Sequence, residues 1–163
     1  MSIHIHTYTC ETLPQHVAAD MVPLTHVGSQ YAKWMLASQA GTKAENTPED
    51  IVWAVASRDQ DFEIKTLGWV AVHFDPATGH PLLAGFVAPS ERRKHLATIL
   101  SAAALMDANA PANAIGVRGL AFMKIASRLG FQSVGLYRPV DDGWIVSWTT
   151  TPAPTQAEDD DAE

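Results

Sequence analysis

The chain has 163 residues, of which 47% are hydrophobic and 18% are charged. This is the size of one domain that can bury a core without cross-links. The single cysteine, Cys10, excludes an internal disulfide and a cysteine-rich zinc site. No apolar run approaches the ~18 residues of a membrane span. We therefore expect a cytoplasmic protein that does not contact a membrane.

The negative charge is concentrated at the C-terminus. The formal net charge is −7, and five of the 18 acidic residues lie in the last six positions, 158–163. The rest of the chain is nearly neutral and lacks the clustered Lys and Arg that nucleic acid binding requires, so no nucleic acid partner is expected. We predict one domain over residues 1–148 and an acidic, disordered tail over 149–163, since the tail has no large apolar side chains to bury.

The hydrophobic pattern along the chain predicts an alternation of strands and helices. In chain order, we expect strands at 3–9, 51–57, 66–74, 82–87, 114–117, 133–137 and 144–148. Helices are expected within 12–39, 96–106 and 120–129, and Pro23 should divide the first of these segments in two. A turn is expected at 59–61. The continuous apolar run at 82–87 is typical of a strand buried on both faces.

The resulting order is β, α, α, β, β, β, α, β, α, β, β. It predicts an α/β (mixed α+β) fold, in which a mixed sheet carries helices on its faces. Periodicity alone leaves open an unrelated α/β module whose elements fall in this order.

A short cationic segment follows the apolar strand and opens a helix. Residues 86–100 read FVAPSERRKHLATIL and contain a match to a pattern [Q/R]-x-x-G-x-[G/A], in which Arg92 holds the first position, Leu96 the apolar position before the last and Ala97 the last, small one. This segment and the order of elements resemble the GNAT (Gcn5-related N-acetyltransferase) superfamily, of which the chain would be a divergent member. The resemblance covers residues 1–148. It implies a central sheet of six to seven strands and a V-shaped cleft between the middle strands.

The resemblance also implies acetyl-CoA as co-substrate. Amides at a helix N-terminus, aided by the helix dipole and by cationic side chains, can hold its pyrophosphate. The residues expected to bind it are Phe86, Val87, Arg92, Arg93, Lys94, His95, Leu96 and Ala97. His95 stands where the family has glycine. The alternative interpretation is that residues 92–94 form the solvated first turn of an ordinary helix.

A second signal lies in the last predicted helix. Residues 120–131 read LAFMKIASRLGF and match the end of the family's Y-x-x-x-G-F pattern. In the family this tyrosine protonates the departing thiolate, but here its position holds Ala126. The asparagine expected seven residues earlier is replaced by Gly119. Alanine cannot donate a proton.

The remaining candidates for proton transfer are two side chains on predicted strands. His73 is the candidate base, because an imidazole titrates near neutral pH, and Tyr137 is a candidate acid. Either could instead be a structural residue of the sheet. His4 and His6 share a strand face, but no third ligand accompanies them, so no metal site is predicted.

Two related functions fit these observations. The first is an N-acetyltransferase that transfers an acetyl group from acetyl-CoA to an unknown amine, on a small molecule or a protein. The alternative is a catalytically degenerate protein of the same fold with a binding or structural role, for example a phage virion component. Because GNAT domains often pair through their last strands, the resemblance also suggests a homo-oligomer.

Overall fold

The computed structural model describes residues 2–76, 79–92, 94–109, 115–118, 120–130, 132–140 and 143–149. Its strands are β1 (Ile3–Thr9), β2 (Val52–Gln60), β3 (Glu63–Phe74), β4 (Pro81–Val87), β5 (Ile115–Arg118), β6 (Gln132–Val140) and β7 (Gly143–Thr149). Its helices are α1 (Gln15–Met21), α2 (Gln30–Gln39), α3 (Leu96–Asp107) and α4 (Leu120–Arg128), with 3-10 turns η1 (Val22–Leu24) and η2 (Pro89–Glu91). The expected order of elements is confirmed. Except for Thr149, the predicted tail lies outside the described residues.

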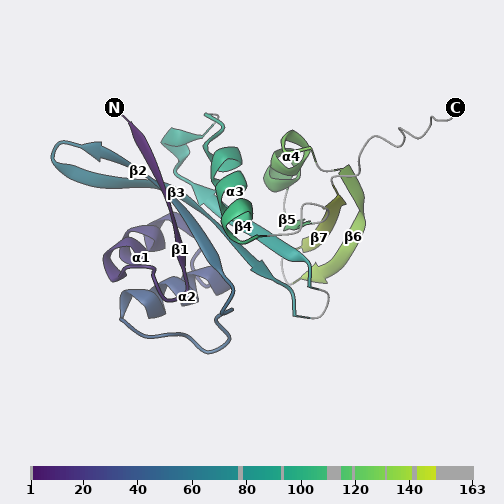
Figure 1. Ribbon diagram of the computed structural model, residues 1–163, viewed down its shortest axis with the longest axis horizontal. Coiled ribbons are helices and arrows are strands. Elements are labelled where there is room, and N and C mark those ends of the chain that lie inside the picture. The colour runs from purple at the N-terminus through teal and green to yellow at the C-terminus, as the bar shows by residue number, and fades with distance from the viewer. Residues whose placement is uncertain are drawn as a thin grey trace, which may run out of the picture.

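The strands form one seven-stranded sheet in the order β1-β2-β3-β4-β5-β7-β6 (Figure 1). All neighbours are antiparallel except β4 and β5, which are parallel. A parallel pair needs a crossover connection, and α3 supplies it between β4 and β5. The predicted mixed sheet flanked by helices is therefore confirmed.

Alternate residues of the central strands build two separate cores, because successive side chains of a strand point to opposite faces. Trp53 and Trp69 pack with Met35 and other residues of α1 and α2 on one face. Val70 and its alternating neighbours pack with Leu100 and other residues of α3 and α4 on the opposite face. Each face of the sheet thus has its own helical layer.

The segment between β1 and β2 divides as predicted. Pro23 lies in η1, which ends α1, and α2 begins seven residues later. Ser29 caps α2, since its hydroxyl oxygen accepts a hydrogen bond of 3.1 Å from the backbone N–H of Ala32. The indole N–H of Trp69 donates to the carbonyl of Leu24 at 2.8 Å and holds the α1–α2 connection against the sheet.

Two local predictions are wrong. The expected turn at 59–61 lies further along, because β2 continues to Gln60, and Asp61 and Phe62 form the turn with positive φ angles of 51° and 68°. Strand β4 is not buried on both faces: Leu83 is buried, whereas Phe86, on the opposite face, is only partly covered. The reason is that α2 and the α1–α2 connection shield that face of β4 less completely than α3 shields the other.

Candidate functional site

The parallel pair β4–β5 diverges after two residues. Leu82 pairs with Gly116 and Leu83 with Val117, and from Ala84 to Val87 β4 forms no further pair with the described part of β5, which ends at Arg118. On its other side, β4 stays paired with β3 along its whole length. This divergence is the geometry that the predicted V-shaped cleft requires. Its open end lies where β4 leads into η2 and α3.

The turn that enters α3 has a left-handed residue at the position where the pattern expects glycine. His95 has φ 60° and ψ 16° and directly precedes Leu96, the first residue of α3. Glycine adopts this conformation without steric cost, whereas other residues adopt it rarely. The chain therefore keeps the backbone shape of the pattern although it lacks the residue that favours this shape.

Backbone donors remain available at this helix start. The first N–H groups of a helix have no acceptor within the helix. Among the residues that the structure describes, no backbone carbonyl accepts from the N–H of Leu96 or Thr98. The positive end of the helix dipole lies at the same place. The start of α3 thus offers donors and partial positive charge to an anion.

Arg92 is fixed over the end of β4. Its Nε donates to the carbonyl oxygen of Val87 at 2.9 Å, and its guanidinium carbon lies 5.1 Å from the centre of the Phe86 ring. Its two terminal nitrogens have no partner within the described part of the chain. An arginine held in this way keeps donors free for a phosphate, at low entropic cost.

A buried carboxylate, which the sequence analysis missed, lies in the same turn. Glu91 accepts two hydrogen bonds from Arg58 of β2, at 2.9 and 3.1 Å, and one of 3.3 Å from Lys94. The hydrogen bonds from Arg58 lower the pKa of Glu91 below its usual range, against the opposing effect of burial. Lys94 is therefore partly neutralised by Glu91. Arg93 lies outside the described residues.

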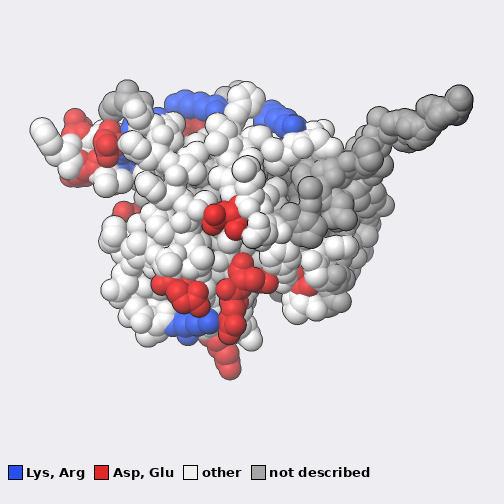
Figure 2. All heavy atoms as spheres, viewed as in Figure 1, with Lys and Arg blue, Asp and Glu red and all other residues white. Residues whose placement is uncertain are grey.

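Figure 2 shows Lys and Arg side chains at the upper edge of this view, and Asp and Glu side chains both in its lower half and around the tip of the β2–β3 hairpin on the left. A blue side chain also lies among the lower red ones, so positive and negative charge are not fully separated on this face.

His73 lies on the α1–α2 side of the sheet, near the closed end of the divergence. Its Nε2 and the Tyr31 hydroxyl are 2.8 Å apart, and its ring packs edge-on against Trp34 with centroids 5.4 Å apart. Burial lowers the pKa of His73 to about 4, although Asp50 and Asp75 oppose this shift. At neutral pH the imidazole is uncharged and can accept a hydrogen bond or a proton, but it is a weak base.

The other candidates for proton transfer lie elsewhere. Tyr137 belongs to β6, and the placement of its side chain lies outside what the structure describes. Ala126, at the family's tyrosine position, is fully buried in the core between the sheet and α3–α4. Gly119 lies outside the described residues. Sequence reasoning also missed His26, whose ring meets the edge of Phe86 with centroids 5.4 Å apart.

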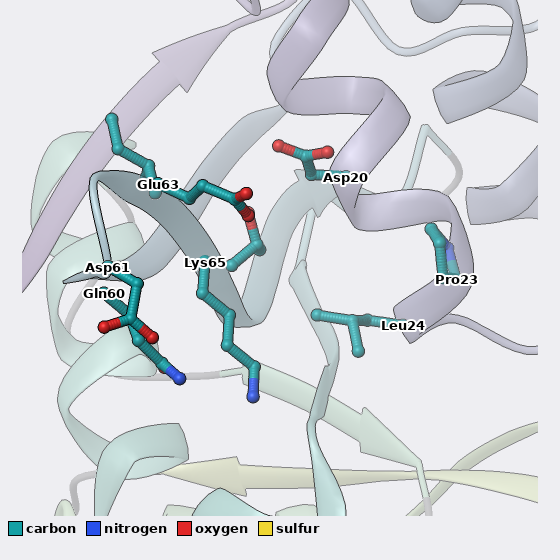
Figure 3. A pocket seen from close by; sticks show the side chains of 9 residues that line it. Asp20, Pro23, Leu24, Gln60, Asp61, Glu63 and Lys65 are labelled. Carbon is teal, nitrogen blue, oxygen red and sulfur yellow. The ribbon is translucent and has the colours of Figure 1, made fainter.

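The described part of the chain lines cavities on the α1–α2 side. One, of about 1050 Å³, is lined by His73 and by residues of α2, the 46–50 segment and the β3–β4 connection. The other, of about 480 Å³, lies between η1 and the β2–β3 hairpin, where Figure 3 shows Leu24 entering from the helix side and Lys65 from the strand side. The second cavity is at the opposite end of β3 from His73.

No helix in the described part of the chain is long and apolar enough to cross a membrane. Within the same residues, no group of three or more His, Cys, Asp or Glu side chains is arranged to hold a metal ion. His4 lies instead 3.5 Å from the carboxylate of Asp59.

Solved structures share this architecture. An acyl-CoA N-acyltransferase from Pseudomonas aeruginosa superposes with a TM-score of 0.58 at 16% identity, over 91% of this chain and 99% of that one. A GNAT-family acetyltransferase from Streptococcus pneumoniae gives 0.59 at 14% identity, with the same coverage. The chain has the GNAT fold.

The GNAT fold is thus reached with little sequence similarity. The PaiA N-acetyltransferase from Thermoplasma acidophilum, solved in complex with coenzyme A, superposes with a TM-score of 0.57 at 12% identity over 91% of this chain and 99% of that one. No family model and no curated protein matches the sequence. The two departures noted above, His95 and Ala126, lie within the segments through which the sequence resembles the family.

Proposed function

We propose that this chain is an acetyl-CoA-dependent N-acetyltransferase. The observation that carries the proposal is the combination of a β4–β5 divergence with a helix start that presents free amides and an anchored Arg92 at its open end. The solved structures of the same fold support it, because two of them contain coenzyme A or acetyl-CoA.

In the proposed complex, the pyrophosphate of acetyl-CoA lies against the N–H groups at the start of α3 and the free nitrogens of Arg92. The pantetheine arm follows the unpaired edge of β4 from Val87 toward Leu82, a distance of about 17 Å for five residues of extended chain. The thioester then lies between the strands, and an acceptor amine approaches it from the α1–α2 side.

The reaction needs little covalent chemistry from the protein. The nitrogen lone pair of the amine attacks the thioester carbonyl carbon, the carbon–sulfur bond breaks, and coenzyme A leaves as a thiolate. The proton of the amine must pass to a base, and His73 is the candidate in this chain because its imidazole is neutral at pH 7. Tyr137 is the candidate to protonate the thiolate. Most of the catalysis then comes from positioning.

A specific observation also favours the degenerate alternative. Ala126 has no hydroxyl group and is enclosed by the core, so α4 supplies no proton at the family position. In this second function the chain binds coenzyme A or a partner without turning over an amine.

The first test is calorimetric titration with coenzyme A. We expect binding, and we expect Arg92→Gln to weaken it about 10- to 100-fold, because a charge-assisted bond to phosphate is lost. Two controls isolate the phosphate contact. Arg128→Gln removes an equal charge at the end of α4 and should bind coenzyme A as tightly as the native chain does. Pantetheine lacks the pyrophosphate, so Arg92→Gln should not weaken its binding.

The outcomes separate the functions. If coenzyme A does not bind to the folded protein, the proposal fails. If it binds but no amine in a broad panel is acetylated, the degenerate function replaces the enzymatic one.

A further inference from the structure

The β2–β3 hairpin has a free edge near its tip. Strand β3 pairs with β2 from Glu63 onward, but it pairs with β4 only from Gly68 onward. Residues 63–66 therefore have a strand on one side, and no strand in the described part of the chain pairs with their other side. The hairpin extends past β1 as an arm (Figure 1), and residues 61–65 are exposed to solvent. An exposed edge of this kind can pair with the strand of another molecule.

The turn of the hairpin decides which backbone groups face this edge. Residues 61–62 form a two-residue turn, and Gln60 and Glu63 are the hydrogen-bonded pair that closes it. Because the direction of the backbone groups alternates along a strand, the N–H and C=O groups of Ile64 point away from β2 and toward the free edge. Ile64 thus offers one donor and one acceptor to a partner strand.

The charges along the edge are complementary to those of a second copy. Two such edges can pair as antiparallel strands around a two-fold axis, with each Ile64 opposite the other. In this register Glu63 of each copy lies opposite Lys65 of the other, at positions where facing side chains approach closely. Neither side chain forms an ion pair within the described residues. Centring the pairing on Lys65 would instead place two lysines opposite each other, so charge favours the register centred on Ile64.

An aromatic side chain extends into solvent from the tip of the arm. Phe62 is 110% exposed and has a φ of 68°. Glycine is favoured at this position of a two-residue turn, because it adopts a positive φ without strain. A phenyl ring here strains the backbone and buries no surface against the described part of the chain. Strain and apolar exposure at one residue are the features expected where a chain contacts a partner.

A cavity lies where the paired arrangement brings this ring. It has a volume of about 480 Å³ and is lined by Ile64 and Thr66 of the hairpin and, from the helix side, by Leu24 (Figure 3). When the two Ile64 residues face each other, Phe62 of one copy lies opposite Thr66 of the other, at the wall of that cavity. Because the arrangement has two-fold symmetry, the same contact forms twice.

We propose that the chain forms a two-fold symmetric dimer through the β2–β3 hairpin. Residues 62–66 of the two copies pair as antiparallel strands, and each Phe62 enters the cavity of the other copy. The contact is confined to the arm and the rim of one cavity. We therefore expect a reversible dimer with a Kd on the order of 10–100 μM, as suits an interface that buries less than ~1,200 Å². This surface is distinct from β6 and β7, the strands on which the resemblance placed a homo-oligomer.

Sedimentation velocity of the full chain, from about tenfold below to about tenfold above this Kd, measures the dimer. Glu63→Lys and Lys65→Glu should each weaken it about tenfold or more, because like charges then face each other twice. Mixed in equal amounts, these two variants should form a heterodimer, since every facing pair is again of opposite charge. Glu45→Lys makes the same charge change at an exposed position outside the hairpin, and it should leave the dimer unchanged.

Phe62→Gly separates contact with the second copy from strain within one chain. At a concentration where the chain is monomeric, the variant should melt at a higher temperature, because glycine relieves the positive φ. It should also weaken the dimer about tenfold, because it removes the ring from the interface. A variant that is less stable as a monomer would show that the ring supports its own hairpin, and would overturn the role given to Phe62.

The remaining outcomes decide the proposal as a whole. A chain that stays monomeric at every concentration overturns it. A dimer that forms equally well with Glu63→Lys also overturns it, because the copies then meet through another surface, such as β6 and β7. If the two charge variants stay apart when mixed, the register centred on Ile64 is wrong.

Discussion

Acidification should destabilise the protein through one buried histidine. The pKa of His73 is about 4 in the folded chain because desolvation disfavours the imidazolium ion, whereas a histidine in an unfolded chain titrates near 6.5. As the pH falls below 6.5, the unfolded state binds a proton that the folded state does not. The free energy of unfolding therefore falls as the pH is lowered from 6.5 to 4. Below pH 4 both states bind the proton, and His73 causes no further loss.

The size of the effect follows from the two pKa values. At pH 4.5 the difference in proton binding corresponds to about 2.5 kcal/mol of unfolding free energy, relative to pH 7.5. Against a total stability of roughly 5–15 kcal/mol, this is a large fraction. Asp50 and Asp75, which face the imidazole, act in the opposite direction and are already included in the folded pKa.

Urea unfolding at pH 7.5 and pH 4.5 measures this contribution. Other groups also titrate in this range, so the comparison is made with His73→Gln, which removes the proton site and can still hydrogen-bond to Tyr31. The loss on acidification should be about 2.5 kcal/mol smaller in the variant than in the native chain. His16→Gln, at an exposed position, controls for the loss of any histidine. Equal losses in the native chain and His73→Gln would refute the burial argument.

Two further predictions concern the strand and turn at the open end of the site. His95→Gly should tighten coenzyme A binding in a calorimetric titration and leave the melting temperature unchanged or higher, since it relieves a left-handed residue costing about 1 kcal/mol. His95→Val should weaken coenzyme A binding and lower the melting temperature. If the two variants behave alike, the left-handed backbone at residue 95 has no role in coenzyme A binding. Gly85→Ala should cost about 2 kcal/mol in urea unfolding, because its Cβ would lie 2.5 Å from the Trp69 carbonyl oxygen and 2.8 Å from Val70 Cγ2. A neutral Gly85→Ala would show that β3 and β4 can move apart.

The order of elements was predictable because it depends on local periodicity. The strands alternate between two cores, and the break at Pro23 needs only the geometry of proline. The position of the β2–β3 turn was not predictable, because it places Phe62, an apolar aromatic residue, at positive φ where sequence rules expect glycine or asparagine.

The contacts within the site were less accessible to sequence reasoning. Arg58 and Glu91 are 33 residues apart and Tyr31 and His73 are 42 apart, so no local spacing links either pair. The sequence indicated three cationic residues, 92–94, at the start of α3. It did not indicate that the buried carboxylate of Glu91 accepts a hydrogen bond from Lys94, which makes Lys94 less available to a phosphate. The left-handed conformation at His95, in contrast, follows from the glycine position in the pattern.

The absence of a proton donor at Ala126 affects the rate more than the possibility of reaction. A thiol has a pKa near 8.5, so a thiolate leaves without assistance far more readily than an alkoxide. A general acid typically contributes a factor of about 10² to 10⁴. An enzyme that lacks it can still use positioning, provided that the thioester is held between β4 and β5. Because Arg92 and the start of α3 decide whether it is held, coenzyme A binding must be established before the lost tyrosine can be taken as evidence against catalysis.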